Sequence, residues 1–382
     1  MNQEIQEKIV RLRHELHAHP ELSMEERETK KRLMDFLSEH TSLKIEDRGR
    51  FFYAVYEGRK DGTGHSGHGE PIAFRADMDA LPMEEKPGLP YGSQNPGVCH
   101  KCGHDGHSAA LCGLALEVDR LGAERPVYFI FQHGEEIGGG GEECSRLLTE
   151  KGIRQVFAFH NMSGYPEKTV VVKSGIIQCT SKGLTVEMEG TPAHASQPED
   201  GKNPAAALSR LALEVEALAG SNQKRPEFDG FLLATIVELS VGSRNFGIAA
   251  SRGSLSVTLR ADYERDLERL DEMIREQAQK LALEYGLSVS FHEQDFFPET
   301  VNDEEVAGRV RKAAAALGLP VTELPRPFRG SEDFGYYLKR CPGAIFYIGN
   351  GTDYPQLHTM DYDFNDQILE TAVDLFLELL RV

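Results

Sequence analysis

Nearly apolar segments alternate with amphipathic ones over the first 180 residues, and this alternation limits the fold more than any other feature of the sequence. The amphipathic segments have helical periodicity and lie near residues 4–18, near residues 26–39 and in SAALCGLALEVDRL. The apolar segments predict strands, in FFYAVYEG, PIAFRAD, PVYFIFQ, QVFAFH and TVVVK. Strands without a polar side are buried on both faces, so helices must cover both sides of the sheet. The sequence therefore predicts an α/β sandwich.

The order of elements changes at about residue 181. GLTVEMEG predicts a strand, NPAAALSRLALEVEALAG a helix, FLLATIVELS and SLSVTLRAD two strands, DLERLDEMIREQAQKLALEYG a helix and LSVSFHE a strand. This βαββαβ order is that of a ferredoxin-like module. A helix, the strand AIFYIG and a helix from about residue 365 follow it. We therefore predict a catalytic α/β domain in two segments, 1–180 and 297–382, with the module 181–296 inserted between them.

Composition narrows the range of functions. Lys and Arg number 42 and Asp and Glu number 61, and the net charge of −19 repels a phosphate backbone, which argues against nucleic acid as a partner. No apolar run reaches the ~20 residues that span a bilayer, and the N-terminal residues do not read as a secretory signal. Six unevenly spaced cysteines do not form a disulfide framework. We expect a cytoplasmic protein without a membrane partner, and we interpret His65 and His68 as solvent-facing loop residues.

Two clusters of potential ligands follow predicted strands in the first segment. Asp77 ends PIAFRAD and Asp79 follows two residues later, so both point the same way from an extended backbone, although a turn is the ordinary alternative for such aspartates. Cys102 and His104 lie close together in VCHKCGHDGHSAALCG, where glycines allow a tight backbone path. Thiolate and imidazole are donors that zinc and related metals favour. We expect the dipole of the following helix to help keep Cys102 ionised.

A third cluster follows the strand PVYFIFQ. Glu135 and Glu136 are adjacent, so their side chains point in different directions, and one can bind metal while the other acts as a general base. His160 closes the strand QVFAFH, and His358 lies near the C-terminal helix. Either histidine alone would more often be structural. Together the donors suffice for two ions that share one ligand and a water: Cys102, His104, Glu136, His160 and His358.

These residues also carry a family resemblance over nearly the whole chain. The blocks occur in one order: RHELHAHPELSMEE, RADMDALP, HKCGHDGHSA, FQHGEE, the His160 strand, EGTPAHASQPEDGKNPAAAL, GSEDFGYYL and LHTMDYDF. This order resembles the aminoacylase, hippurate hydrolase and auxin-conjugate amidohydrolase branch of a dimetal peptidase family. Chance does not produce so many ordered blocks.

The resemblance implies a role for each matched residue. Cys102 matches the bridging thiolate and Glu135 the general base, and the remaining ligands are His104, Glu136, His160 and His358. Asp79 matches a carboxylate that orients a ligand or the bridge. In the inserted module, His194 matches the histidine that steadies the oxyanion, and Asn245 and Arg252 fall where relatives hold the substrate carboxylate. Zinc or manganese is the expected metal, and cobalt and nickel also fit.

The implied function is hydrolysis of the amide bond of an N-acyl amino acid or a similar small amide. Water activated between two cations attacks the carbonyl, and Glu135 takes its proton and returns it to the leaving amine. The inserted module resembles the family's lid and dimerisation domain, so we expect a homodimer in which His194 acts within one chain or across the interface. His133, Gly134 and Cys99 depart from the usual pattern beside the metal ligands.

Three other functions compete with this prediction. A redox protein would use Cys99 and Cys102 as a dithiol, but it leaves the glutamates and distant histidines unexplained. A structural zinc site usually has a second CxxC pair, which the chain lacks. A family member that has lost catalysis would only bind a small molecule or metal, and the presence of Glu135 argues against it.

Overall fold

The chain folds into two compact units. The computed structural model describes residues 1–59, 69–86, 88–219 and 227–381, so His65 and His68 lie outside the described residues. The first unit comprises Met1–Ile177, Thr300–Arg326 and Asp333–Val382, and the second comprises Gln178–Glu299 and Pro327–Glu332. The second unit therefore includes residues 327–332, which the predicted division places in the catalytic domain. Residues 327–332 belong to the second unit because the backbone N–H of Cys179, in the same unit, donates to the carbonyls of Phe328 and Gly330 at 3.1 and 3.2 Å.

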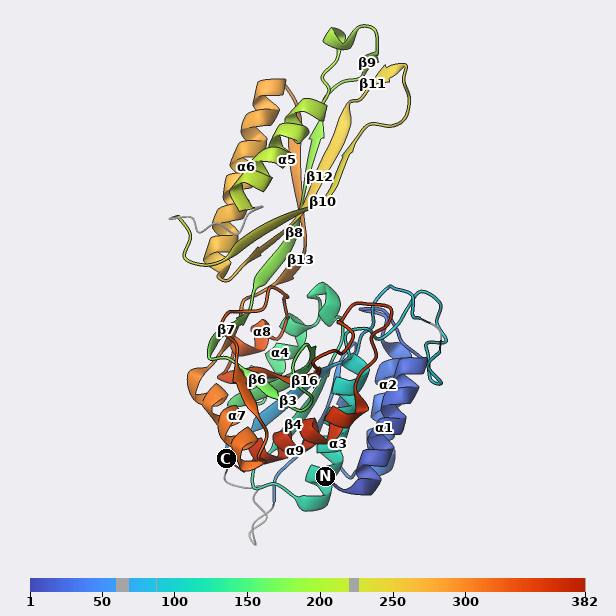
Figure 1. Ribbon diagram of the computed structural model, residues 1–382, viewed down its shortest axis with the longest axis vertical. Coiled ribbons are helices and arrows are strands. Elements are labelled where there is room, and N and C mark those ends of the chain that lie inside the picture. The colour runs from blue at the N-terminus through green and yellow to red at the C-terminus, as the bar shows by residue number, and fades with distance from the viewer. Residues whose placement is uncertain (60–68, 87, 220–226, 382) are drawn as a thin grey trace. The chain divides into compact units, whose positions relative to one another are not determined.

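An eight-stranded sheet forms the centre of the first unit (Figure 1). Its order is β1-β2-β4-β3-β5-β16-β6-β15. The strands are β1 (Lys44–Asp47), β2 (Phe52–Tyr56), β3 (Ile72–Asp77), β4 (Val127–Gln132), β5 (Gln155–Ser163), β6 (Val170–Val172), β15 (Val321–Glu323) and β16 (Gly343–Gly351). The five apolar segments predicted as strands in the first 180 residues all lie in this sheet, and the prediction of a mixed α/β fold with a large sheet is confirmed.

The central strands β4, β3, β5 and β16 run parallel. Every residue of β3 is buried, and β16 is buried up to its last residue, so both faces of the sheet are covered. Parallel strands end at the same edge of a sheet, and ligands of such sheets bind beyond those carboxyl ends. The edge at which β3, β4, β5 and β16 end is therefore the place to look for the site.

Helices pack around this sheet in two groups. In one group α1 (Gln3–Ala18), α3 (His104–Leu121) and α9 (Leu369–Leu379) contact one another, α7 (Glu304–Ala316) contacts α9, and α2 (Arg27–His40) contacts α3. In the other, α4 (Gly141–Glu150) contacts α8 (Gly335–Leu338). Residues 104–118 of α3 are all buried, which makes this helix a rigid support for the loop before it.

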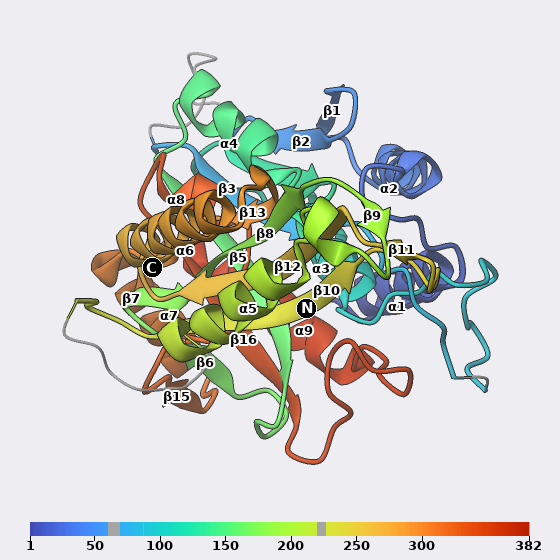
Figure 2. The same cartoon turned by 90° about the horizontal axis from the view of Figure 1, so that it is seen from above.

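The second unit has the element order strand, helix, two strands, helix, strand. Its antiparallel sheet has the order β10-β12-β8-β13, and two helices lie side by side against it (Figure 2). The elements are β8 (Thr180–Glu189), α5 (Ala205–Ala219), β10 (Leu232–Val241), β12 (Arg252–Ala261), α6 (Glu264–Tyr285) and β13 (Ser288–Phe297). Alternate residues of β8, Leu184, Val186 and Met188, join the core beneath the helices. A short ribbon of β9 (Ala193–His194) and β11 (Ile248–Ala249) completes the unit.

Within the described parts of the chain, no helix combines the length and the apolar content that crossing a bilayer requires.

Truncation of the core beneath the site tests this fold. Leu111 of α3 is fully buried, so Leu111→Ala is expected to lower the free energy of unfolding by about 2–5 kcal/mol through lost burial and a cavity. Leu317, which is 37% exposed, is the matched control, and Leu317→Ala should cost about 1 kcal/mol or less. Urea unfolding of chelator-treated protein measures both values. Equal losses for the two variants would contradict the packing described for α3.

Candidate metal centre

The edge formed by the parallel strands gathers the predicted ligands. Asp77 is the last residue of β3, and Glu135 and Glu136 open a short 3-10 helix, η1 (Glu135–Ile137), that follows β4. His160 lies within β5, near its carboxyl end. His358 follows β16 in the long segment before α9. Residues far apart in sequence therefore meet because their strands run parallel and end together.

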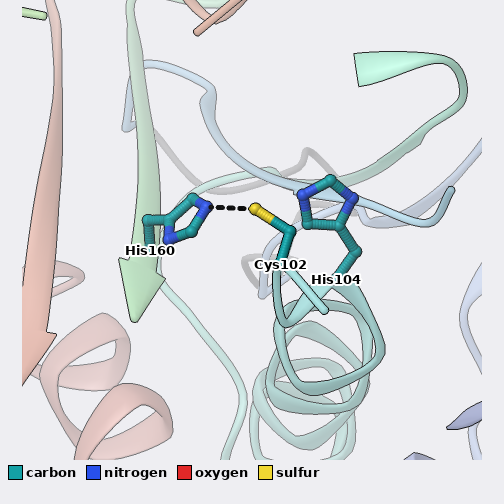
Figure 3. Close-up of side chains that lie close together, drawn as sticks. All are labelled: Cys102, His104 and His160. Carbon is teal, nitrogen blue, oxygen red and sulfur yellow. Dashed lines mark hydrogen bonds between the residues drawn. The ribbon is translucent and has the colours of Figure 1, made fainter. Parts of the chain in front are cut away.

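A glycine turn places the thiol and the first imidazole. Gly103 caps α3 with φ of +103°, and a Cβ at this position would lie 2.3 Å from Asn161 Oδ1. Only glycine fits both the backbone angle and the contact. Cys102 and His104 flank this turn, and Figure 3 shows their side chains directed toward the same space as that of His160.

The donor atoms form two groups that share Cys102. One group is Cys102, His104 and His160, and the other is Cys102, Glu136 and His358; within each group the donor atoms lie within 4.8 Å of one another. The sulfur of Cys102 lies 3.4 Å from His160 Nε2 (Figure 3). Donors that bind one zinc ion at about 2.0–2.3 Å lie roughly 3–4 Å from each other, and the distance from Cys102 to His160 falls in this range.

Glu135 lies beside both groups without being needed to complete either. His104 Nε2 is 3.7 Å from Glu136 Oε1 and 3.8 Å from Glu135 Oε2, distances too long for hydrogen bonds. Glu135, Glu136 and His104 form a further group of donors within 4.8 Å. Glu135 is only 5% exposed, and its carboxylate lies near the imidazole of His104. The structure thus brings together the predicted base and all five predicted ligands.

Two buried atoms in the cluster indicate that a cation belongs there. Among the described residues, His104 Nε2 and Glu136 Oε1 have no hydrogen-bond partner although both atoms are buried. Buried polar atoms are rarely left in this state in native proteins. A divalent cation would satisfy both, and thiolate, imidazole and carboxylate are donors suited to zinc and related metals. The residues present therefore fit the two metal ions that the family resemblance implies.

The pKa shifts describe the cluster before any cation is bound. Burial raises the pKa of Glu136 to about 7 and raises the pKa of the Cys102 thiol well above its usual range. Burial opposes charge on His104 as well, but Asp77 and Asp79 outweigh it and raise the pKa of His104. Burial thus acts on the Cys102 thiol in the direction opposite to that expected of the dipole of α3. A bound cation would supply the missing charge and displace these protons.

Asp79 forms hydrogen bonds with two of the predicted ligands, His104 and Glu136. His104 Nδ1 donates to Asp79 Oδ1 at 3.0 Å, which leaves His104 Nε2 to face the cluster. The other oxygen, Oδ2, accepts from the backbone N–H of Glu136 at 3.0 Å and from Ser23 Oγ at 2.7 Å. Burial alone would raise the pKa of the Asp79 carboxyl group, but the hydrogen bond from His104 acts in the opposite direction, and the pKa is lowered. Asp79 thus orients ligands and is not one of the donors.

Asp77 belongs to a structural network beneath the cluster. Its carboxylate lies 2.6 Å from His107 Nδ1 and accepts from Arg75 Nη1 at 2.7 Å. The other ring nitrogen of His107 lies 2.6 Å from Asn161 Oδ1. Asp77, His104 and His107 also form a group of potential donors, but both nitrogens of His107 are already engaged.

The other predicted site residues lie in the second unit. His194 is exposed on β9, with Nδ1 2.7 Å from Ser196 Oγ. Asn245 precedes β11, which pairs with β9, and its Oδ1 accepts from Gly247 N at 3.1 Å. Arg252 begins β12, and its 77% exposed side chain donates to Glu189 Oε1 at 2.9 and 2.7 Å. His194 and Asn245 thus lie on neighbouring segments of one unit, separate from the donor cluster in the other.

The residues that depart from the family pattern are buried and occupied by structural contacts. His133 Nδ1 lies 3.8 Å from Cys144 Sγ, and burial lowers the pKa of His133. The Cys99 thiol donates to the carbonyl of Met83 at 3.1 Å, and burial raises its pKa to about 11. A thiol with such a pKa is a poor nucleophile, which argues against the dithiol alternative.

Sequence reasoning missed Glu26. Its carboxylate accepts from the backbone N–H of Gly134 at 2.7 Å and so fixes the turn before Glu135. Burial, reinforced by the charge of Asp79, raises the pKa of Glu26 to about 7. The block RHELHAHPELSMEE contains Glu26, but a glutamate that caps a helix looks the same in sequence as one that supports a distant turn.

Known proteins match nearly the whole chain. Residues 73–382 match the model of peptidase family M20/M25/M40. The N-acetylcysteine deacetylase of Bacillus subtilis strain 168 is 28% identical over 377 residues, which cover 97% of this chain and 96% of that protein. The hippurate hydrolase of Campylobacter jejuni is 29% identical over 395 residues, which cover 98% and 96%.

A solved structure agrees as well. A Bacillus subtilis protein described as a dinuclear metal-binding peptidase of family M20 superposes with a TM-score of 0.80 at 26% identity, covering 99% of this chain and 98% of that one. These matches confirm the resemblance found in the sequence blocks and the prediction of an amidohydrolase. The chain belongs to peptidase family M20/M25/M40.

Proposed function

We propose that this protein hydrolyses the amide bond of N-acyl amino acids with the help of two divalent cations. The observation that carries the proposal is the pair of donor groups that share Cys102, with Glu135 beside them. The substrates named for the relatives, N-acetylcysteine and hippurate, are both N-acyl amino acids and support this substrate class. A member of the family that only binds small molecules or metal would not need Glu135 at this position.

Each donor group would hold one cation. Cys102, His104 and His160 would hold the first, and Cys102, Glu136 and His358 would hold the second. When bound, the two cations lower the pKa of a water from about 15.7 toward about 7 and polarise the substrate carbonyl. Zinc suits the thiolate and imidazole donors, and manganese, cobalt and nickel are also compatible with the mixed set.

Glu135 moves the proton. Its carboxylate takes a proton from the attacking water and returns it to the nitrogen of the leaving amine, so the C–N bond breaks without release of a free amide anion. Gly134, with φ of +58°, and the hydrogen bond from Gly134 N to Glu26 fix the turn that aims Glu135. Asp79 keeps His104 and Glu136 in place throughout.

The second unit supplies the groups that grip the substrate. We assign it as a ferredoxin-like lid and dimerisation domain, inserted between the two segments of the catalytic domain. Its sheet order and its two packed helices support the assignment. His194 stabilises the oxyanion, and Asn245 and the exposed cation of Arg252 hold the substrate carboxylate. The protein works as a homodimer in the cytoplasm, and the six free cysteines are consistent with a reducing compartment.

The reaction class and the metal can be tested together. Chelator-treated protein should be inactive on acetyl, benzoyl, indole-acetyl and aminobenzoyl amino acids. Stepwise addition of zinc, manganese, cobalt or nickel should restore hydrolysis and reach its maximum at two ions per chain, because each donor group needs one. Release of free amino acid measures the reaction. Full activity without metal would rule out the proposal.

The assignment of Glu135 gives a second test. Glu135→Gln is expected to lower kcat by about 10²- to 10⁴-fold, since the amide cannot accept the proton. Metal content should stay at the wild-type value, because Glu135 is not assigned as a ligand. Glu142→Gln, which removes an exposed carboxylate 2.9 Å from Arg146, is the matched control. Near-normal turnover by Glu135→Gln would show that another group takes the proton.

The shared thiolate gives a third test. Cys102→Ala should lower both metal content and rate, because both groups lose a donor. Cys112 is a buried thiol within α3, and Cys112→Ala should change neither the metal content nor the rate. Elemental analysis after dialysis provides the measurement, and two ions retained by Cys102→Ala would exclude the thiolate as the bridge.

A further inference from the structure

Lys101 joins the segment that carries His358 to the turn that carries Cys102. The side chain is buried, with 1% of the residue exposed. Its ammonium donates to the backbone carbonyl of Tyr362 at 2.5 Å and pairs with the carboxylate of Glu85. Its own backbone carbonyl accepts from His358 N at 2.8 Å. One residue therefore contacts both ends of the segment 358–362.

His358 depends on such contacts for its position. Its backbone is in the left-handed region, with φ of +60°, which non-glycine residues rarely adopt without support from their surroundings. Its side chain is 51% exposed, so packing does little to hold it, yet Nε2 lies 3.7 Å from Glu136 Oε1. The location of this imidazole is therefore set mainly by the backbone of the segment.

The carboxylate that pairs with the Lys101 ammonium is itself held by further contacts. Glu85, its carboxylate partner, also contacts His17 Nε2 at 2.8 Å and accepts from Ser93 N at 2.7 Å. The other ring nitrogen of His17 lies 2.8 Å from Asp105 Oδ2. A buried lysine is tolerated only where its charge is paired, and here the pairing also restricts where the ammonium can point.

We propose that Lys101 is a positioning residue for the second cation, holding His358 close enough to Cys102 and Glu136 to complete that donor group. The inference rests on the metal centre proposed above. The first donor group, Cys102, His104 and His160, contains no residue of the segment 358–362. Loss of the Lys101 ammonium should therefore weaken one ion selectively, while a general structural defect would weaken both.

Calorimetric titration of the chelator-treated full chain with zinc tests the proposal. Wild type should bind two ions. Lys101→Met keeps the length of the side chain and removes the ammonium, and it should bind the first ion normally and the second about 10- to 100-fold more weakly, as expected when support behind a ligand is lost. His358→Ala is the reference and should show the same selective loss.

Lys86→Met is the matched control. Lys86 contacts the same segment through Asp361 at 2.9 Å, but the lysine side chain is 66% exposed, and exposed ion pairs contribute little. Both ions should bind this variant as they bind wild type. Thermal unfolding of the chelator-treated variants checks the fold. Glu85 keeps His17 and Ser93 as partners, so Lys101→Met leaves no unpaired carboxylate.

Several outcomes would overturn the inference. If Lys101→Met binds both ions as tightly as wild type, the Lys101 ammonium is not needed to position His358 for the second ion. Loss of both ions together with a lower unfolding temperature would assign Lys101 a purely structural role. If Lys101→Met does not fold, Glu85→Gln must weaken the second ion, and unchanged binding by that variant would also overturn it. Failure of wild type to bind zinc would refute the metal centre itself.

Discussion

The crowding of donor atoms, most of them buried, into one small space is the constraint on which this structure depends. Without a cation, His104 Nε2 and Glu136 Oε1 have no hydrogen-bond partner among the described residues, and the thiol of Cys102 is held protonated by its burial. Such an arrangement opposes folding unless rigid elements enforce it. The buried helix α3 and the parallel strand ends provide that rigidity, and a cation removes the penalty by binding the same atoms.

The residues around the predicted ligands are themselves joined by hydrogen bonds. Asp79 joins three elements by binding Ser23, His104 and the backbone of Glu136. Below it, Arg75 donates to Asp77, Gln132 and Asp333, which links the ends of β3 and β4 to the last third of the chain. Substitutions in these layers would therefore affect the metal centre without touching a ligand.

Sequence reasoning succeeded where the deciding information is local. Apolar strands, amphipathic helices and the CGH turn each show in a few neighbouring residues, so the large sheet could be predicted, and the residues proposed as ligands lie close together in the structure. It failed where a distant residue decides the outcome. Helix α4 begins with glycine, which disfavours a helix, and the carboxylate of Asp333 accepts from Gly141 N across 192 positions, so the start of this helix depends on a residue that the local sequence does not show. The burial of Cys102, which opposes ionisation of its thiol, is likewise revealed only by the fold.

The place of β16 in the sheet has a consequence for how the protein is made. This strand lies between β5 and β6, yet it comes from Gly343–Gly351, and His358 follows it. A chain emerging from the ribosome therefore displays four of the five residues proposed as ligands while β5 is paired on one side only, with β3. Until β16 fills that gap, both the open strand edges and the half-built cluster are exposed, which makes this the stage at which the nascent protein is most prone to aggregation and to capture of the wrong metal.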